Sequence, residues 1–237
     1  MMHGVKICGL TNLNDAEAAL AAGASFLGFV FVPRSKRFIT ADIAASLTHS
    51  IGENAQSSAH QLKPAGVNQH PKRVGLFVDP ANDMLDEYIG RAQLDLIQLH
   101  GDESPARVAD IRNRYQKPII KAIPVATPDD LKTGFIYQDI VDYLLLDAKP
   151  PANAVVPGGN AVSFDWNILE KAQIDASRKS RPLYPISWFL AGGLNPDNVQ
   201  IAIQKTGAKL IDCASGVERA PGIKDHDAIT RFINQAR

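Results

Sequence analysis

The run Tyr143-Leu144-Leu145-Leu146, followed at once by Asp147, is the segment that decides the fold. It has no polar face to offer to water. Such runs are typical of parallel strands that helices cover on both sides. Seven more runs of this kind occur, over residues 5–8, 26–31, 74–78, 94–99, 119–123, 186–191 and 209–213. The sequence therefore predicts eight buried parallel strands.

The segments between these runs carry helix-start signals. Ser104, Thr127 and Asn195 each precede a proline, and Asn12 and Thr127 each stand three residues before an aspartate. Eight strand–helix units leave two topologies, a closed barrel or an open doubly wound sheet. The glycine fingerprint of dinucleotide-binding folds is missing after the first strand, and so is a P-loop. We therefore expect a single α/β domain over residues 1–237, a (β/α)8 TIM barrel, a fold that commonly takes ~250 residues.

Two segments interrupt this alternation. Residues 52–71 are rich in Ser, Gln, Asn, Gly and Pro and have no periodic apolar residues, so we expect a mobile surface insertion between the second helix and the third strand. A lid is disfavoured there, because that connection lies at the stability face of a barrel. Residues 148–163 follow the sixth strand, and we expect them to form a loop at the catalytic face.

Composition excludes several classes of protein. Hydrophobic residues make up 45% of the chain and charged residues 21%, which is ordinary for a globular domain. The formal net charge is zero, which argues against nucleic-acid binding but leaves room for a small anionic ligand. No signal peptide or membrane-spanning run is present, so we expect a cytoplasmic location and no membrane partner. The two cysteines, Cys8 and Cys213, predict no disulfide, and no C-x-x-C or H-x-x-x-H predicts a metal site.

The residues just past the strand ends should converge on one site. Glycines follow the seventh and eighth strands, where backbone N–H groups can surround a phosphate. The alternative is that the glycine pair only makes a tight turn. The predicted phosphate-binding residues are Gly192, Gly193, Ser215 and Gly216.

Seven segments in register resemble the phosphoribosylanthranilate isomerase family of tryptophan biosynthesis. The resemblance spans nearly the whole chain outside the insertion. The segments are Lys6-Ile7-Cys8-Gly9-Leu10-Thr11-Asn12, Ser35-Lys36-Arg37, Gln98-Leu99-His100-Gly101, Leu145-Leu146-Asp147, Phe164-Asp165-Trp166, Ala191-Gly192-Gly193-Leu194-Asn195-Pro196 and Ser215-Gly216-Val217-Glu218.

The resemblance implies an isomerase of the intramolecular oxidoreductase class. Its reaction is an Amadori rearrangement of N-(5-phosphoribosyl)anthranilate to 1-(2-carboxyphenylamino)-1-deoxyribulose 5-phosphate. Asp147 would be the general acid and Cys8 the general base. No electron leaves the substrate, so no cofactor is expected. The helix beginning near Asn12, together with Lys6, is expected to lower the pKa of Cys8.

Each of these residues also has a plainer explanation. Cys8 could be a small core residue, although its position at a strand end beside glycine favours catalysis. Asp147 could cap a loop or pair with Lys149, but an aspartate after three leucines is costly to bury without purpose.

Three further side chains are candidates for binding substrate. Arg37 is expected to grip the substrate carboxylate with its two-pronged guanidinium. His100 could face the aromatic ring or its carboxylate, or else cap the backbone. Asp212 could touch substrate or, if it faces inward, balance Lys6; Cys213 would then point outward and pack against helices.

Two other kinds of function remain open at this stage. One is a related barrel enzyme acting on another phosphoribosyl compound, such as the imidazole-pathway isomerase or indoleglycerol phosphate synthase. The first favours two aspartates and the second a lysine with a glutamate, so Cys8 opposite Asp147 speaks against both. The other is a non-catalytic phosphate-binding barrel, which the presence of both acid and base disfavours. The sequence leaves the oligomeric state open and slightly favours a monomer.

Overall fold

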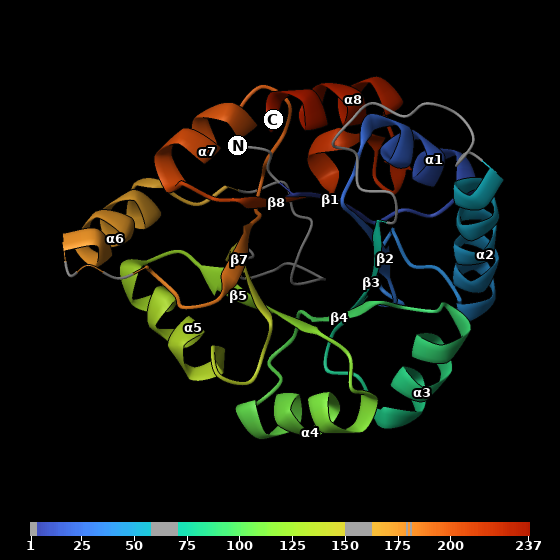
Figure 1. Cartoon of the computed structure of the whole chain (residues 1–237), viewed down its shortest axis with the longest axis horizontal. Coiled ribbons are helices and arrows are strands. Elements are labelled where there is room, and N and C mark those ends of the chain that lie inside the picture. The colour runs from blue at the N-terminus through green and yellow to red at the C-terminus, as the bar shows by residue number, and fades with distance from the viewer. Residues whose placement is uncertain (1–3, 58–70, 150–162, 179, 181) are drawn as a thin grey trace.

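The structure is a computed structural model that describes residues 4–57, 71–149, 163–178, 180 and 182–237. In these residues eight parallel strands pair in chain order and close into a barrel, β1 against β8 (Figure 1). The predicted (β/α)8 barrel is confirmed, and each of the eight predicted runs falls on one strand. The strands are β1 Gly4–Cys8, β2 Phe26–Val30, β3 Lys72–Phe77, β4 Leu96–Leu99, β5 Ile119–Val125, β6 Tyr143–Ala148, β7 Ser187–Leu190 and β8 Leu210–Cys213.

Helices surround the barrel, as the view along its axis shows (Figure 1). Short 3-10 turns precede α5 and follow β8, and a small hairpin lies before the last helix. The helices are α1 Leu13–Ala22, α2 Ala41–Ser57, α3 Asn82–Arg91, α4 Pro105–Tyr115, α5 Leu131–Tyr137, α6 Asn167–Arg178, α7 Val199–Thr206 and α8 His226–Gln235. The smaller elements are η2 Pro128–Asp130, η3 Ser215–Val217, β9 Glu218–Ala220 and β10 Ile223–Lys224.

The strands are apolar on both faces because each face packs against a different layer. One core lies between the strands and the helices, and it includes Ile7, Leu146 and Cys213. A smaller core fills the barrel interior, as expected for a barrel packed with side chains. Its buried members are Phe26, Val74, Leu96, Ile120, Ala122, Leu145, Phe189 and Ala191.

Three of the four helix-start predictions hold. The Asn12 side chain caps α1 by accepting from the backbone N–H of Asp15, and Ser104 caps α4 in the same way with Pro105 in the first turn. Thr127 starts η2 with a capping box. The fourth prediction is wrong, because α7 begins only at Val199. The Asn195 side chain instead accepts from the N–H groups of Asp197 and Asn198, which makes a turn ahead of the helix.

The predicted insertion begins too early. Helix α2 runs to Ser57, so residues 52–57 are helical and belong to the preceding element. Once a helix is nucleated, adding one more residue costs little, and poor helix formers can extend it. The rest of the predicted insertion, 58–70, lies outside the described residues, as does most of the predicted loop 148–163. Of that loop, Ala148 is the last residue of β6.

Two absences can be stated for the described part of the chain. None of its helices is long and apolar enough to cross a membrane. Within the same residues, no group of three or more His, Cys, Asp or Glu side chains is arranged to hold a metal ion.

Candidate functional site

Cys8 ends β1 and is 3% exposed. Its side chain lies on the same face of β1 as that of Lys6, whose Nζ donates to Asp212 Oδ1 at 2.8 Å inside the barrel. Gly28 is the partner of Cys8 on β2, and a Cβ there would lie 2.9 Å from Sγ. The missing side chain at position 28 therefore leaves the thiol its place in the barrel mouth.

The environment of Cys8 differs from the one expected. Burial raises the pKa of the Cys8 thiol, and this effect outweighs the attraction of the Lys6 ammonium, which lowers it. The negative charge of the Asp212 carboxylate adds to the rise, because it disfavours a thiolate nearby. The expectation of a lowered pKa is therefore wrong. Lys6 does lower the pKa of Cys8, as expected, but its ammonium group forms an ion pair with Asp212.

Asp147 lies on β6 and shares its strand face with Leu145, which belongs to the barrel interior. Its Oδ2 lies 3.2 Å from Nε2 of His100, and its Oδ1 accepts from the N–H of Ala148 at 2.9 Å. The other ring nitrogen of His100, Nδ1, lies 2.9 Å from the side-chain amide nitrogen of Gln98. Asp147 is thus one end of a buried polar chain that runs across β4 and β6.

The loops after β7 and β8 pack tightly on one another. Gly192 and Gly193 have φ of 85° and 63°, a left-handed conformation that glycine adopts readily. A Cβ on Gly192 would lie 2.6 Å from the backbone nitrogen of Ala148, beside Asp147. A Cβ on Gly216 would overlap the carbonyl oxygen of Leu194. These contacts bring the predicted phosphate-binding loops together next to the end of β6.

Arg37 is held by a carboxylate of the protein. Its Nε and one terminal nitrogen donate to the two oxygens of Glu218 at 2.7 and 2.8 Å. Glu218 also accepts from Lys224 Nζ at 2.9 Å, and Lys224 donates to the carbonyl of Ala214. Although burial opposes ionisation, Arg37 and Lys224 lower the pKa of Glu218. Among the described residues, the second terminal nitrogen of Arg37 has no partner, so it is the one available to a ligand.

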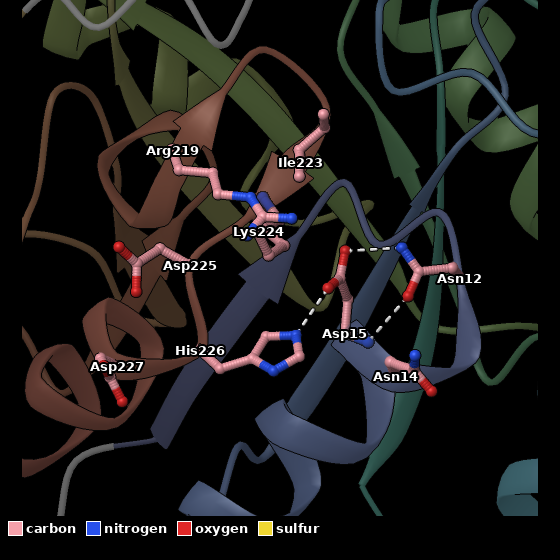
Figure 2. A pocket seen from close by; sticks show the side chains of 9 residues that line it. All are labelled: Asn12, Asn14, Asp15, Arg219, Ile223, Lys224, Asp225, His226 and Asp227. Carbon is pink, nitrogen blue, oxygen red and sulfur yellow. Dashed lines mark hydrogen bonds and ion pairs between the residues drawn. The ribbon is translucent and has the colours of Figure 1, made fainter.

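A hollow of about 560 Å³ lies between the first turn of α1 and the start of α8 (Figure 2). None of the nine predicted site residues lines it. Across it His226 Nε2 lies 2.8 Å from Asp15 Oδ1, which ties the two helix starts together. Both positively and negatively charged side chains line it, so the charge of the hollow favours neither an anionic nor a cationic ligand.

The model of N-(5'-phosphoribosyl)anthranilate isomerase matches residues 5–235. This chain belongs to that family. The isomerase of Paracoccus denitrificans is 46% identical over 236 residues, which cover 100% of this chain and 98% of that protein. The isomerase of Paramagnetospirillum magneticum is 45% identical over 98% of this chain and 96% of its own length. The family match confirms the resemblance drawn from the seven segments.

Solved structures of the phosphoribosylanthranilate isomerase family share the fold. The enzyme of Thermotoga maritima is 34% identical and superposes with a TM-score of 0.78, covering 99% of this chain and 98% of that one. A family structure in complex with reduced 1-(o-carboxyphenylamino)-1-deoxyribulose 5-phosphate is 33% identical with a TM-score of 0.74, at the same coverage. This chain is therefore an isomerase of the same barrel architecture.

The isomerase fold brings most of the predicted site residues to one end of the barrel. Cys8, His100 and Asp147 lie at the ends of β1, β4 and β6, and the residues predicted to bind phosphate follow β7 and β8. Asp212 faces inward but is paired with Lys6, which is the structural alternative for that residue; a substrate contact stays a prediction. Cys213 belongs to the core between strands and helices, as expected.

Three residues of the site were not assigned a role from the sequence. Glu218 and Gln98 stand within the quoted family segments, but nothing in their spacing shows that one binds Arg37 and the other His100. Lys224 has no sequence signal, since a single lysine before α8 is typical of a surface residue. Its side chain is nevertheless fully buried.

Proposed function

We propose that this protein converts N-(5-phosphoribosyl)anthranilate to 1-(2-carboxyphenylamino)-1-deoxyribulose 5-phosphate in tryptophan biosynthesis, without a metal or a redox cofactor. The observation that carries the proposal is the placement of a thiol and a carboxyl group, Cys8 and Asp147, on inward-facing positions at the ends of β1 and β6. These strands are separated by β7 and β8, so the two groups lie on different sides of the same barrel mouth. Membership of the isomerase family supplies the substrate class.

The substrate would be held at both ends. The backbone of Gly192, Gly193, Ser215 and Gly216 would hold the phosphate, because closely approaching N–H groups suit an anion. Arg37 would hold the anthranilate carboxylate through the terminal nitrogen that does not bind Glu218, while Glu218 fixes the orientation of the guanidinium. The proposed contact is monodentate, whereas the sequence alone predicted a bidentate contact between Arg37 and the carboxylate.

Asp147 would act first, as the general acid. It would give its proton to the furanose ring oxygen. The bond from C1 to that oxygen would break, and the nitrogen lone pair would form the C=N bond of a Schiff base. His100, at 3.2 Å, is placed to orient the carboxyl group.

Cys8 would act second, as the general base. Its thiolate would remove the proton at C2 of the sugar, and the electron pair of that bond would form the enolamine and discharge the cationic nitrogen. Tautomerisation to the ketone completes the reaction. Electrons move from C2 to C1 within one molecule, so neither an oxidant nor a reductant is consumed.

The test is a fluorescence assay that follows the loss of phosphoribosylanthranilate with purified protein and neither metal nor nicotinamide added. We expect turnover under these conditions, also after treatment with a chelator. Rescue of a tryptophan auxotroph lacking the isomerase is an independent check. No turnover, or turnover that depends on added metal, would contradict the proposal.

A further inference from the structure

The buried side-chain amide of Gln98 is hydrogen-bonded through its nitrogen but not, among the described residues, through its oxygen. The side chain lies on β4 and is 0% exposed. Its nitrogen lies 2.9 Å from Nδ1 of His100, whereas its oxygen, Oε1, has no hydrogen-bond partner among the described residues. A buried acceptor left without a donor destabilises the folded state, because it gives up its hydrogen bonds to water and gains none in return. An amide kept in such a position calls for an explanation beyond packing.

In the orientation that the structure shows, the Gln98 amide decides which nitrogen of the neutral His100 ring carries the proton. An amide nitrogen can only donate, so Nδ1 must offer its lone pair, and the proton of the neutral ring then stands on Nε2. This proton points at Oδ2 of Asp147, 3.2 Å away. Oδ1 already accepts from the N–H of Ala148. In this arrangement Asp147 accepts at both oxygens, which suits the ionised carboxylate.

A half-turn of the Gln98 amide exchanges donor and acceptor in both hydrogen bonds that link Gln98, His100 and Asp147. Oε1 would then face Nδ1 and accept its proton, and Nε2 of His100 would present a lone pair to Asp147. A protonated Asp147 could donate to that lone pair. The same half-turn gives Oε1 a hydrogen-bond partner, and the amide nitrogen then loses its contact with Nδ1.

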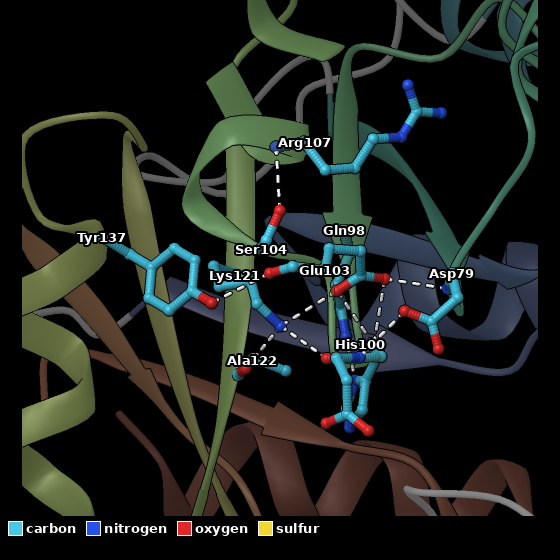
Figure 3. Close-up of polar contacts among 11 residues, drawn as sticks. Asp79, Gln98, His100, Glu103, Ser104, Arg107, Lys121, Ala122 and Tyr137 are labelled. Carbon is cyan, nitrogen blue, oxygen red and sulfur yellow. Dashed lines mark hydrogen bonds and ion pairs between the residues drawn. The ribbon is translucent and has the colours of Figure 1, made fainter. Parts of the chain in front are cut away.

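We propose that the amide of Gln98 is a positioning group that sets the tautomer of His100 and, through it, whether Asp147 faces a donor or an acceptor. One orientation suits the ionised carboxylate, and the other suits the proton-bearing acid that opens the sugar ring. The catalytic consequence rests on the proposed function, because it needs Asp147 to be the general acid; the tautomer itself does not. Figure 3 shows Gln98 and His100 together beside the polar network of the β4 loop.

The other charged groups near the hydrogen-bonded residues Gln98, His100 and Asp147 have partners of their own. Lys6 and Asp212, from β1 and β8, pair with each other, and so do Glu103 and Lys121 beside β5 (Figure 3). Asp79, after β3, accepts from the N–H of Asp102. Cys8 lies with Lys6 and Asp212. Within the described residues only Gln98 and Asp147 hydrogen-bond the His100 ring, so the amide is the group that selects its tautomer.

The spectroscopic test is nitrogen-15 NMR of the histidine rings, which distinguishes a protonated from an unprotonated ring nitrogen. At neutral pH we expect wild-type His100 to be unprotonated at Nδ1 and protonated at Nε2. Gln98→Glu replaces the donor by an acceptor, so Nδ1 should become protonated. Gln98→Met removes both functions at similar volume and should leave a mixture of the two tautomers.

The kinetic test uses the same two variants. Neither can present a donor and an acceptor in turn, so kcat should fall at least ~10-fold in both. KM should stay within about threefold, because the groups proposed to hold phosphate and carboxylate are untouched. Gln138→Glu is the matched control, since Gln138 at the end of α5 also has an unpartnered buried Oε1 and the charge change is the same. It should alter neither kcat nor the His100 spectrum.

The outcomes separate the two proposals. An unchanged His100 tautomer in Gln98→Glu overturns the positioning role, whatever the activity. A changed tautomer with normal kcat overturns the link to Asp147. Wild-type protein that fails to turn over phosphoribosylanthranilate refutes the proposed function instead, and the NMR comparison still decides the tautomer.

Discussion

A thiol that is to act as a base must first lose its proton, and the burial of Cys8 opposes that loss. Because burial raises its pKa above that of an ordinary cysteine, the neutral thiol is favoured in the folded protein at neutral pH. The rate of alkylation by iodoacetamide should therefore be low at pH 7 and rise about tenfold per pH unit to beyond the ordinary cysteine pKa of ~8.5. The measurement is mass spectrometry of Cys8 in a Cys213→Ala background, which removes the second buried thiol.

The unfolded chain provides the reference for this experiment. In denaturant the same thiol should follow an ordinary cysteine pKa of ~8.5 and react faster at neutral pH. A folded protein whose alkylation rate has already levelled off at pH 7 would show that Cys8 is a thiolate in the free enzyme. Burial would then not be the dominant influence on it.

Substituting the two proposed catalytic groups is the direct test of their roles. Cys8→Ala and Asp147→Asn should each lower kcat by at least ~10², because each removes a proton transfer that the other cannot supply. Binding of a phosphate ligand should be largely retained, since neither side chain belongs to the loops proposed to hold phosphate. Near-normal turnover in either variant would refute its assigned role, and Cys213→Ala should keep wild-type activity.

At this scale the sequence located the candidate residues better than it described their surroundings. The positions of Cys8, His100 and Asp147 follow from strand ends, and strand ends follow from apolar runs. The hydrogen-bond partners of these residues cannot be predicted in this way when they are distant in sequence. Glu218 lies 181 residues from Arg37, and only the closed barrel brings them together. The pKa of Cys8 likewise depends first on its burial in the closed barrel and then on the charges of Lys6 and of Asp212, which lies on β8 at the far end of the sequence.

Among the elements, the junction of the β7 and β8 loops is the most restrictive. Gly216→Ala would drive a methyl group into the Leu194 carbonyl, so the loops must separate. If the separation removes one backbone hydrogen bond to phosphate, about 1.5 kcal/mol, affinity falls ~10-fold. We expect the dissociation constant for inorganic phosphate, measured by calorimetry, to rise by at least that factor.

A glycine in open space serves as the control. Gly90 in α3 has nothing within 4 Å of a Cβ, so Gly90→Ala should leave phosphate affinity unchanged and the protein at least as stable. Unchanged phosphate affinity in Gly216→Ala would place the phosphate site elsewhere.

Element boundaries show where local sequence signals stop being sufficient. All eight barrel strands were predicted, because a run buried on both faces has few other ways to hide its side chains, whereas the short β9 and β10 were not. Caps that act within one turn, such as Asn12 and Ser104, were also predicted. Asn195 carries the same signal, yet its side chain closes a turn, and α7 starts three residues beyond Pro196. Residues 52–57 extend α2 despite their polar composition.

On the scale of the whole molecule, the decisive contact is the one that closes the barrel. β1 and β8 are the first and last strands of the barrel, and Lys6 and Asp212 stand opposite one another across that seam, 206 residues apart in the chain. Both side chains are buried or nearly so. Burial alone would lower the pKa of Lys6, but Asp212 and Cys8 raise it above the usual value. The ammonium is therefore present at all pH values below the ordinary lysine pKa of ~10.4, and its contribution to stability is lost only as pH rises beyond that.

Removing one partner of this seam pair should cost far more than removing both. Lys6→Met leaves the Asp212 carboxylate buried without its counter-ion and should lower the free energy of unfolding by about 3–5 kcal/mol. Lys6→Met/Asp212→Leu should regain most of that loss, because two apolar side chains need no compensation. Urea unfolding at pH 7 measures both, read from the midpoint at constant slope. Lys132→Met, which breaks the exposed pair with Asp129, should change stability by less than about 0.5 kcal/mol. Equal losses in the single and double seam variants would contradict this, because they would mean that the unpaired Asp212 carboxylate is not the source of the loss and that two apolar side chains cannot replace the ion pair.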